Sequence, residues 1–429
     1  MVRHKVNKHL DLLGVGIGPF NLSLAAILDK TKNINYKFFE QKKEFNWHSE
    51  IMFSDSDMQT SYLKDLVTPV DPTSPHSFLN YLVKNGLFHA FMNTNRQVVT
   101  RREFEMYCQW VTENLSHRLS FNSPVTNIDF DGLNFITTIN GEEYTSKHIC
   151  VGTGLTPRIP DCAVDLISNN FFHAKSPLLG DLNIEGRDVV IIGGGQTGIE
   201  ILRNSFKSKW GKAKSIKLVT GRSALQPLDE SPFTNEFFTP NYVDAFFDIS
   251  ADIKAPIVKS QKLSSDGNTP SYLIEIYREL YQLKFVEGGA FDIKILPSRR
   301  LEKVEKIGDQ YMLIFKNNFN KSFSELKADI VILCTGFDNT IPAILNPIKS
   351  RIKFDEDGRF VFNKTFSVKW NGPQYNKIYA LNFSRHSHGI SEPQTSLMAW
   401  RSAVIANDLS SSVIYSQDNH VSNFMSYTN

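Results

Sequence analysis

Two glycine-rich turns carry the clearest chemistry in this sequence. The first reads GVGIGPFNLSLAAIL from residue 14, and the second reads GGGQTG from residue 193. Each follows a short apolar run and precedes a helical pattern, the arrangement that seats a dinucleotide pyrophosphate on backbone N–H groups. The two turns therefore predict two dinucleotide-binding sites in one chain.

In the first turn, Gly14 permits the tight bend, Gly16 lets the backbone approach the pyrophosphate, and Gly18 completes the predicted site. Pro19 stands where we expect the third glycine of the fingerprint. The first turn of a helix tolerates proline because the missing N–H costs little there. Glu40 ends the next strand, 26 residues after Gly14, where an acid commonly binds a ribose hydroxyl. A glycine turn that serves chain geometry alone is the alternative.

The second turn has the full GxGxxG spacing, with Gly193, Gly195 and Gly198. The strand that follows its helix, SIKLVT, leads to Arg222 rather than to an acid. Arginine can pair with a 2′-phosphate in a forked geometry, whereas an acid would repel it, so this site favours NADPH over NADH. The alternative for Arg222 is a solvated surface residue.

A chain with two such sites usually passes a hydride from a nicotinamide to a flavin. FAD is then the expected occupant of the first site, and NADPH of the second. Disulfide reductases share this layout but need a paired CxxC. The four cysteines form no such pair; they are Cys108, Cys150, Cys162 and Cys334.

Composition excludes several other classes. Lys+Arg 47 against Asp+Glu 45 gives a net charge of +2, which offers no reason to expect a nucleic acid partner. The scattered cysteines argue against a disulfide framework or a metal site and fit a reducing cytoplasm. The sequence shows no signal-peptide core and no stretch apolar enough to span a membrane. We therefore expect a cytoplasmic protein without an integral membrane segment.

Both turns sit in a repeated order of strand, turn, helix and strand, which predicts an α/β fold with two Rossmann-like dinucleotide-binding domains. HICVGTGLTP (148–157) and DIVILCTGF (329–337) are predicted strands that return the chain to the first sheet. The second βαβ unit lies between them, so we expect the second domain to be inserted in the first. A helix is predicted over 268–285, with Thr269 as its cap and Pro270 in its first turn.

The expected domain limits follow from these strands. The FAD-binding domain spans 1–165 and 326–429, and its second part also closes the substrate site. The NADPH-binding domain spans 166–325 and includes segments of the substrate site. A smaller, mostly helical substrate region completes the predicted architecture.

Longer motifs resemble one family over nearly the whole chain. They are GVGIGPFNLSLA, NWHSEIMFSDSDMQTSYLKDLVTPVDPTSPHSFLNYLVKNGLF, GGGQTG, ALQPLDESPFTNEFFTP and HGISEPQTSLMAWRSA. The sequence is similar to the microbial flavin-dependent N-hydroxylating monooxygenases, the lysine N6- and ornithine N5-hydroxylases of siderophore biosynthesis, and most similar to the lysine branch. The resemblance makes the GxGxxP form of the first turn, and so Pro19, a signature of the class.

The resemblance implies that NADPH reduces FAD and that O2 then forms a hydroperoxide at the flavin C4a position. A neutral primary amine attacks its distal oxygen. L-Lysine is the favoured substrate, with cadaverine, putrescine, histamine or L-ornithine as alternatives. A lysine-type ammonium has a pKa of about 10.4, so holding it neutral at pH 7 costs about 4.6 kcal/mol, which burial in a closed pocket reduces.

Rivals from other classes are a flavin-bound redox sensor or scaffold and an NADPH oxidase that makes only hydrogen peroxide. The intact second turn with Arg222 argues against the sensor. The resemblance also implies a homo-oligomer, and the family likeness suggests a tetramer.

The resemblance assigns roles to individual residues. Trp47, His48 and Gln59 match flavin-side positions, with Gln59 near the isoalloxazine, and core packing is the alternative for Trp47. The NADPH-side positions are Gln196, Thr197, Arg222 and Ser223.

The substrate positions come from three motifs. Lys64 in YLKDLV matches the lysine that holds the substrate carboxylate, and Asn235 in SPFTNE matches an asparagine beside it. Ser396 in QTSLMAW matches a serine that reaches the substrate or its surroundings. The alternatives are a surface lysine and a turn asparagine. Gln59, Lys64 and Asn235 are the residues expected to act most directly in catalysis.

Overall fold

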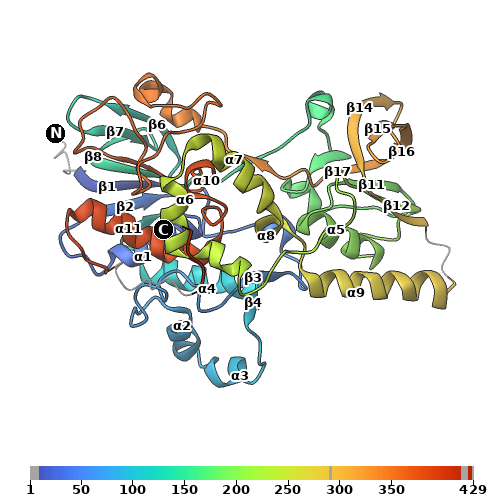
Figure 1. The fold of residues 1–429 in the computed structure, drawn as a ribbon, viewed down its shortest axis with the longest axis horizontal. Helices are drawn as coiled ribbons and strands as arrows, with labels where there is room; N and C mark the ends of the chain where they lie inside the picture. The colour runs from blue at the N-terminus through green and yellow to red at the C-terminus, as the bar shows by residue number, and fades with distance from the viewer. Residues whose placement is uncertain (1–8, 289–291, 417–423, 428–429) are drawn as a thin grey trace, which may run out of the picture.

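The computed structural model describes residues 9–288, 292–416 and 424–427. The ribbon divides into a larger lobe, which holds the beginning and the end of the chain, and a smaller lobe built from the middle of the chain (Figure 1). A mostly parallel sheet organises the larger lobe and a parallel sheet organises the smaller one, which confirms the predicted α/β class.

A seven-stranded sheet forms the centre of the larger lobe, in the order β5-β2-β1-β8-β7-β6, with β19 paired to β8. The strands β5, β2, β1, β8 and β19 pair in parallel, and β6 and β7 extend the sheet antiparallel. The strands span His9–Val15 (β1), Tyr36–Phe39 (β2), Leu119–Ser120 (β5), Val125–Phe130 (β6), Phe135–Ile139 (β7), Glu142–Val151 (β8) and Ile378–Ala380 (β19).

Helix α1 follows the first glycine turn and is buried along nearly its whole length. Its sequence is almost entirely apolar or small, because α11 and α4 pack on it. Helix α4 begins with a capping box in which Thr100 and Glu103 exchange hydrogen bonds. The helices of this lobe span Pro19–Leu28 (α1), Phe78–Lys84 (α2), Phe88–Met92 (α3), Arg101–Asn114 (α4), Arg385–His388 (α10) and Met398–Ser410 (α11).

The smaller lobe has a five-stranded parallel sheet in the order β10-β17-β11-β12-β13, and a three-stranded antiparallel sheet, β14-β15-β16, packs beside it. The parallel strands span Phe171–His173 (β10), Asp188–Ile192 (β11), Ser215–Val219 (β12), Asp292–Leu296 (β13) and Ile330–Leu333 (β17). The antiparallel strands span Arg299–Ile307 (β14), Gln310–Asn317 (β15) and Phe323–Ala328 (β16), and helix α5 spans Gln196–Phe206.

One predicted strand joins the other sheet. β8 is part of the first sheet as expected, but β17 pairs with β10 and β11 of the second, so the prediction that 329–337 returns to the first sheet was wrong. The reason is that IVIL is apolar on both faces, as any central parallel strand must be, and the pattern does not say which sheet buries it. The chain leaves the second sheet only after Leu333.

The middle of the chain also supplies helices to the larger lobe. These are Pro240–Asp248 (α6), Ala251–Ser260 (α7) and Lys262–Asp266 (α8), and α6 and α7 pack on α10. The predicted helix over 268–285 is confirmed as α9 (Pro270–Tyr281), which continues as a π-helix to Val286. Pro270 begins this helix, but the Thr269 side chain does not cap it.

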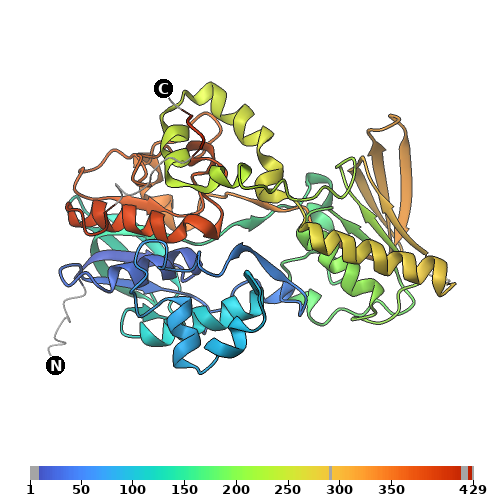
Figure 2. The same cartoon turned by 60° about the horizontal axis from the view of Figure 1, so that its bottom comes forward.

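The lobes are joined at more than the chain crossings. β9 (Thr156–Pro157) and β18 (Phe337–Asp338) pair antiparallel where the chain passes between the lobes. In addition, Ile51 and Phe53 lie in the hydrophobic core of the smaller lobe, although they come early in the sequence. Figure 2 shows this blue segment reaching across to the smaller lobe. The segment therefore fastens the two lobes together.

We predict that Phe53→Ala destabilises the protein by about 3–5 kcal/mol, because the ring is 2% exposed and lies 5.8 Å from the Trp210 ring in the core of the smaller lobe. Phe319→Ala is the matched control, since Phe319 is 88% exposed, and it should change stability by less than about 0.5 kcal/mol. Urea unfolding measures both. Equal midpoints for the two variants would show that the segment does not anchor the lobes.

Candidate active site

Both turns place a glycine directly before a helix. Gly18 precedes α1 with φ −87° and ψ 177°, and Gly195 precedes α5 with φ −88° and ψ −178°. Neither helix has a side-chain cap, and a Cβ on either glycine would meet no atom within 4 Å. Each helix thus begins with uncapped N–H groups beside open space, which fits a pyrophosphate at each turn.

Two glycines before these positions make the turns possible. Gly16 has φ +85° and Gly193 has φ +129°, both in the region that side chains disfavour. A Cβ on Gly16 would overlap the carbonyl oxygen of Gly152, and one on Gly193 would overlap that of Cys334. In each lobe the turn thus packs against the end of the neighbouring strand.

Comparison of the two helix starts corrects the position in the fingerprint that we assigned to Pro19. Gly198 is the third residue of α5, and the third residue of α1 is Asn21. Pro19 is the first residue of α1, so our interpretation that it replaces the third glycine was wrong. The first fingerprint is Gly16, Gly18 and Asn21, and sequence reasoning missed it because Gly14 begins an equally plausible register.

Asn21 occupies the position that Gly198 has in α5. Gly198 lets its helix pack directly on the backbone of the second turn, whereas the Asn21 side chain hydrogen-bonds the first turn. Its amide nitrogen donates to the carbonyl oxygens of Val15 at 3.0 Å and Gly16 at 2.7 Å, and its amide oxygen accepts from the Cys150 thiol at 3.2 Å. The side chain is 1% exposed. These bonds hold the first turn closed at the base of α1.

The residues that end the second strands differ between the lobes. Glu40 directly follows β2, and its carboxylate accepts the N–H of Ile17 in the first turn at 2.9 Å. Thr220 directly follows β12 at the corresponding place, and Arg222 lies two residues further on. A carboxylate suits a ribose hydroxyl, whereas a hydroxyl with an arginine suits a phosphorylated ribose.

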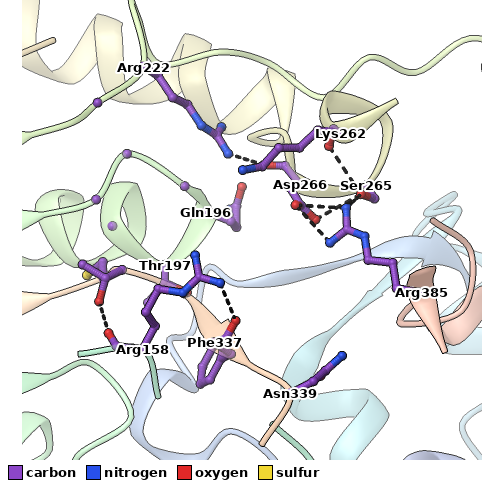
Figure 3. Close-up of a pocket in the computed structure, with 18 of the residues that line it drawn as sticks. Arg158, Gln196, Thr197, Arg222, Lys262, Ser265, Asp266, Phe337, Asn339 and Arg385 are labelled. Carbon is purple, nitrogen blue, oxygen red and sulfur yellow. Dashed lines mark hydrogen bonds and ion pairs between the residues drawn. The ribbon is translucent and has the colours of Figure 1, made fainter. Parts of the chain in front are cut away.

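A cavity of about 1340 Å³ opens in front of the second turn (Figure 3). Its walls carry ten Lys and Arg side chains against four Asp and Glu, so its potential favours an anionic ligand such as a dinucleotide. The basic residues are Arg158, Lys175, Arg222, Lys254, Lys259, Lys262, Arg299, Arg300, Arg359 and Arg385.

Arg222 has an unused donor in this cavity. Its Nη2 donates to the Asp266 carbonyl at 2.8 Å, while its Nη1 is buried without a hydrogen-bond partner among the described residues. The Arg300 side chain lies against Gly221, next to Arg222 in the chain. A 2′-phosphate would supply the missing acceptor, so the arrangement fits NADPH. No sequence motif pointed to Arg300, which lies on β14.

The cavity gathers eight of the predicted site residues, from both lobes: His48, Gln59, Gly193, Gly195, Gln196, Thr197, Gly198 and Arg222. The remaining predicted residues are not part of its lining: Gly14, Gly16, Gly18, Pro19, Glu40, Trp47, Lys64, Ser223, Asn235 and Ser396. Gln59 and His48 thus line the same cavity as the second turn, although they lie nearer to the first turn in the sequence.

Trp47 and His48 occupy different surroundings. The Trp47 ring packs against Phe104 at 5.3 Å and joins the core of the larger lobe, as the core-packing alternative expects. His48 has φ 55°. Burial and the nearby charges of Arg101 and Lys175 lower the pKa of His48 to about 3, so a neutral imidazole lines the cavity at physiological pH.

The predicted substrate residues lie on three separate elements. Burial lowers the pKa of Lys64, which forms no ion pair within the described part of the chain. Ser396 is 4% exposed on a short 3-10 turn, Thr395–Leu397, and its hydroxyl has no hydrogen-bond partner there. Asn235 is exposed on another such turn, Thr234–Phe238.

One contact joins the strand of Gln59 to the turn of Ser396. Gln59 lies on β3 (Asp57–Ser61), and the next residue, Thr60, is 3.3 Å from Thr395 between hydroxyl oxygens. The strand that carries Gln59 therefore lies beside the turn that carries Ser396.

Within 9–288, 292–416 and 424–427, no three His, Cys, Asp or Glu side chains are grouped to hold a metal ion. No helix in these ranges has the length and apolar character needed to cross a bilayer.

Comparison with known proteins defines the class. The family model of L-lysine 6-monooxygenase/L-ornithine 5-monooxygenase matches residues 8–339. The chain belongs to this family of flavin-dependent N-hydroxylating monooxygenases, as the sequence motifs indicated.

Individual relatives differ in the amine they name. The chain is 38% identical to the L-lysine N6-monooxygenase of Escherichia coli over 94% of this chain and 95% of that protein. It is 30% identical to the putrescine N-hydroxylase of Acinetobacter baumannii over 94% and 91%.

Solved structures confirm the fold. The FAD-bound cadaverine monooxygenase of Erwinia amylovora has a TM-score of 0.90 at 24% identity, covering 97% of this chain and 98% of that one. The ornithine N-hydroxylase of Kutzneria sp. 744, with reduced FAD, NADP+ and L-ornithine, has a TM-score of 0.85 at 25% identity, covering 94% and 99%.

The open glycines give a test of both turns. Gly18→Ala and Gly195→Ala should fold normally, because a Cβ there meets no atom, yet each should weaken one cofactor at least tenfold by entering the space before a helix. We expect Gly18→Ala to lower FAD affinity and Gly195→Ala to lower NADP+ affinity, both measured by calorimetry. Gly193→Ala is the contrasting variant and should lose melting temperature, since its Cβ overlaps backbone. Unchanged affinities in both open-glycine variants would contradict the assignment.

Proposed function

We propose that this protein hydroxylates the terminal amine of L-lysine, with FAD bound at the first turn and NADPH in the cavity at the second. The observation that carries the pairing of cofactors is that one cavity is lined by the second turn and also by His48 and Gln59 of the larger lobe. A nicotinamide bound at the second turn would therefore face residues of the flavin lobe.

The residues of the chain divide the work of holding the cofactors. The N–H groups at the start of α1 and α5 bind pyrophosphates, Glu40 binds the FAD ribose, and Arg222 binds the 2′-phosphate of NADPH. When bound, reduced FAD would activate O2, of which one atom is transferred to the amine and the other leaves as water. Trp47, His48 and Gln59 shape the flavin side, and Gln196, Thr197 and Ser223 complete the NADPH side.

Lys64 supports an amino acid as the substrate. A partly buried ammonium that forms no ion pair within the described ranges is costly, and a substrate carboxylate would supply its counter-charge. Asn235 and Ser396 would complete the amino acid site, and the buried Ser396 hydroxyl has a hydrogen bond to offer. The reacting amine must be neutral, and exclusion of water from the pocket favours that form.

A diamine is the second candidate. The putrescine N-hydroxylase relative and the cadaverine monooxygenase structure favour it, because the first resembles this chain in sequence and the second in fold over nearly the whole length. L-Ornithine is a third, favoured by the family model. A diamine would leave Lys64 without a carboxylate partner, and this difference separates the diamines from the two amino acids.

We also propose the organisation of the whole protein. The FAD-binding domain consists of the first 165 residues and the part that follows β17, and the NADPH-binding domain lies between them. Helices α6, α7 and α8, which come from the middle of the chain but pack with the larger lobe, form the small helical substrate region. The four free cysteines suit a reducing compartment such as the cytoplasm. A homotetramer remains our proposal for the assembly.

An amine panel tests the function directly. L-Lysine, L-ornithine, putrescine, cadaverine and histamine are each added to FAD-loaded protein with NADPH and O2, and hydroxylamine product is scored beside NADPH consumption. We expect the highest kcat/KM and the tightest coupling with L-lysine. Hydroxylamine from a diamine alone would contradict the lysine assignment, and hydrogen peroxide without hydroxylamine from every amine would contradict N-hydroxylation.

Lys64→Ala should raise the KM for L-lysine at least tenfold, because the substrate carboxylate loses a charged partner worth about 1.5–3 kcal/mol. Flavin reduction by NADPH should stay within twofold of wild type. Lys84→Ala, which removes an exposed lysine from α2, is the control and should leave both values unchanged. An unchanged KM for L-lysine in Lys64→Ala would overturn the role of Lys64.

A further inference from the structure

Gln196 is held at both ends of its side-chain amide. It is the first residue of α5 and lines the cavity (Figure 3). Its amide oxygen accepts the N–H of Thr269 at 2.9 Å, and its amide nitrogen donates to Glu200 Oε1 at 2.9 Å. A side chain fixed in this way has one orientation before any ligand arrives.

Glu200 ties this arrangement to the other lobe. It lies one turn along α5 and is 0% exposed. Its two carboxylate oxygens accept from the guanidinium of Arg101 at 2.9 and 2.8 Å. Arg101 is the first residue of α4 in the larger lobe, so a buried bidentate ion pair spans the boundary between the lobes.

Thr269 connects the opposite end to the larger lobe as well. Its hydroxyl accepts from Gln59 Nε2 at 3.2 Å, and Gln59 belongs to β3. The hydrogen bonds therefore run from Arg101 through Glu200, Gln196 and Thr269 to Gln59, and we call this series the interlobe arc. The arc begins and ends in the larger lobe and holds the second turn between its ends.

Buried ion pairs add little net stability, because desolvation offsets the attraction between the charges. Their best-attested effect is to select one arrangement of the parts they join. Here the parts are the second turn and the larger lobe. Their separation sets the distance between a bound nicotinamide and a bound flavin. A 1 Å error at this distance is enough to lower a transfer rate strongly.

We infer that Glu200 is a positioning residue for hydride transfer: through Gln196 and Arg101 it fixes the second turn at the working distance from the flavin lobe. The inference rests on the proposed function only in naming the cofactors. Glu200 touches no reacting atom in this scheme.

A neighbouring network provides a matched control. Arg203 is also on α5 and pairs with Glu279 of α9 at 2.8 and 2.7 Å and with Asp55 of the larger lobe at 3.1 Å. It bridges the lobes as the arc does, but neither Arg203 nor Glu279 lines the cavity. Arg203 and Glu279 lie in the same lobe, so the interlobe contact of this network is Arg203–Asp55. Asp55 does not line the cavity, and a variant there weakens an interlobe ion pair without reaching the second turn.

The experiment compares Glu200→Gln with Asp55→Asn in the full-length, FAD-loaded protein. We expect Glu200→Gln to lower NADP+ affinity, measured by calorimetry, and the rate of anaerobic flavin reduction by NADPH at least tenfold each. The KM for L-lysine should stay within twofold. Asp55→Asn should change all three by less than twofold. Equal losses in both variants would mean that Glu200 acts only in general lobe packing, and the inference would fail.

Glu200→Gln leaves Arg101 without its charged partner, so this variant can lose stability for that reason alone. The double variant Arg101→Met/Glu200→Met removes both charges and keeps apolar volume. We expect it to melt near wild type and still to reduce flavin at least tenfold more slowly. A folded double variant with wild-type NADP+ affinity and reduction rate would overturn the inference. If the wild type itself is not reduced by NADPH, the proposed function fails, whereas NADP+ affinity still tests Glu200.

Discussion

The two lobes must dock in one fixed position for their dinucleotide turns to serve a single reaction. The dinucleotide turns belong to different sheets, and a nicotinamide can reach a flavin only if these sheets keep one relative position. The chain meets this demand with apolar contact, because Ile51 and Phe53 leave the larger lobe and enter the core of the smaller. Burial of such side chains is worth several kcal/mol, far more than the exposed ion pair of Arg158 and Asp338 at the chain crossing.

The docked lobes build one cavity, and its lining suits an anionic ligand. Ten basic side chains line it against four acidic ones, an excess that is unfavourable for the protein alone and favourable once an anionic dinucleotide is bound. The helix start at α5 adds partial positive charge in the same place. His48 contributes no charge there, because burial and the neighbouring cations keep its imidazole neutral. Binding and electrostatics thus act on one cavity that both lobes build.

Local patterns predicted the parts of this fold that depend on neighbours in sequence. Both βαβ units and α9 formed where the glycine turns, Pro270 and the apolar spacing placed them. Two errors came from choices that local pattern does not decide. The apolar run of β17 fits the centre of either sheet, and the glycines at 14, 16 and 18 allow two registers, of which only one places Asn21 at the base of α1.

Long-range pairs were beyond the sequence for a physical reason. Arg101 and Glu200 are 99 residues apart, and nothing in either segment indicates that their charges meet in a buried bidentate pair. Thr269 was predicted as a helix cap from its position before Pro270, yet its hydroxyl and N–H bind Gln59 and Gln196 instead. Tertiary contacts therefore determine the hydrogen bonds of Thr269, although its local sequence indicated a helix cap.

Anaerobic mixing of the FAD-loaded protein with NADPH tests most directly whether the two turns serve one reaction. The flavin absorbance near 450 nm should bleach completely with one equivalent of NADPH, and NADH should act much more slowly because Arg222 has no 2′-phosphate to bind. A flavin that stays oxidised while NADPH is bound would contradict the account, since the docked lobes would then hold two cofactors that never meet.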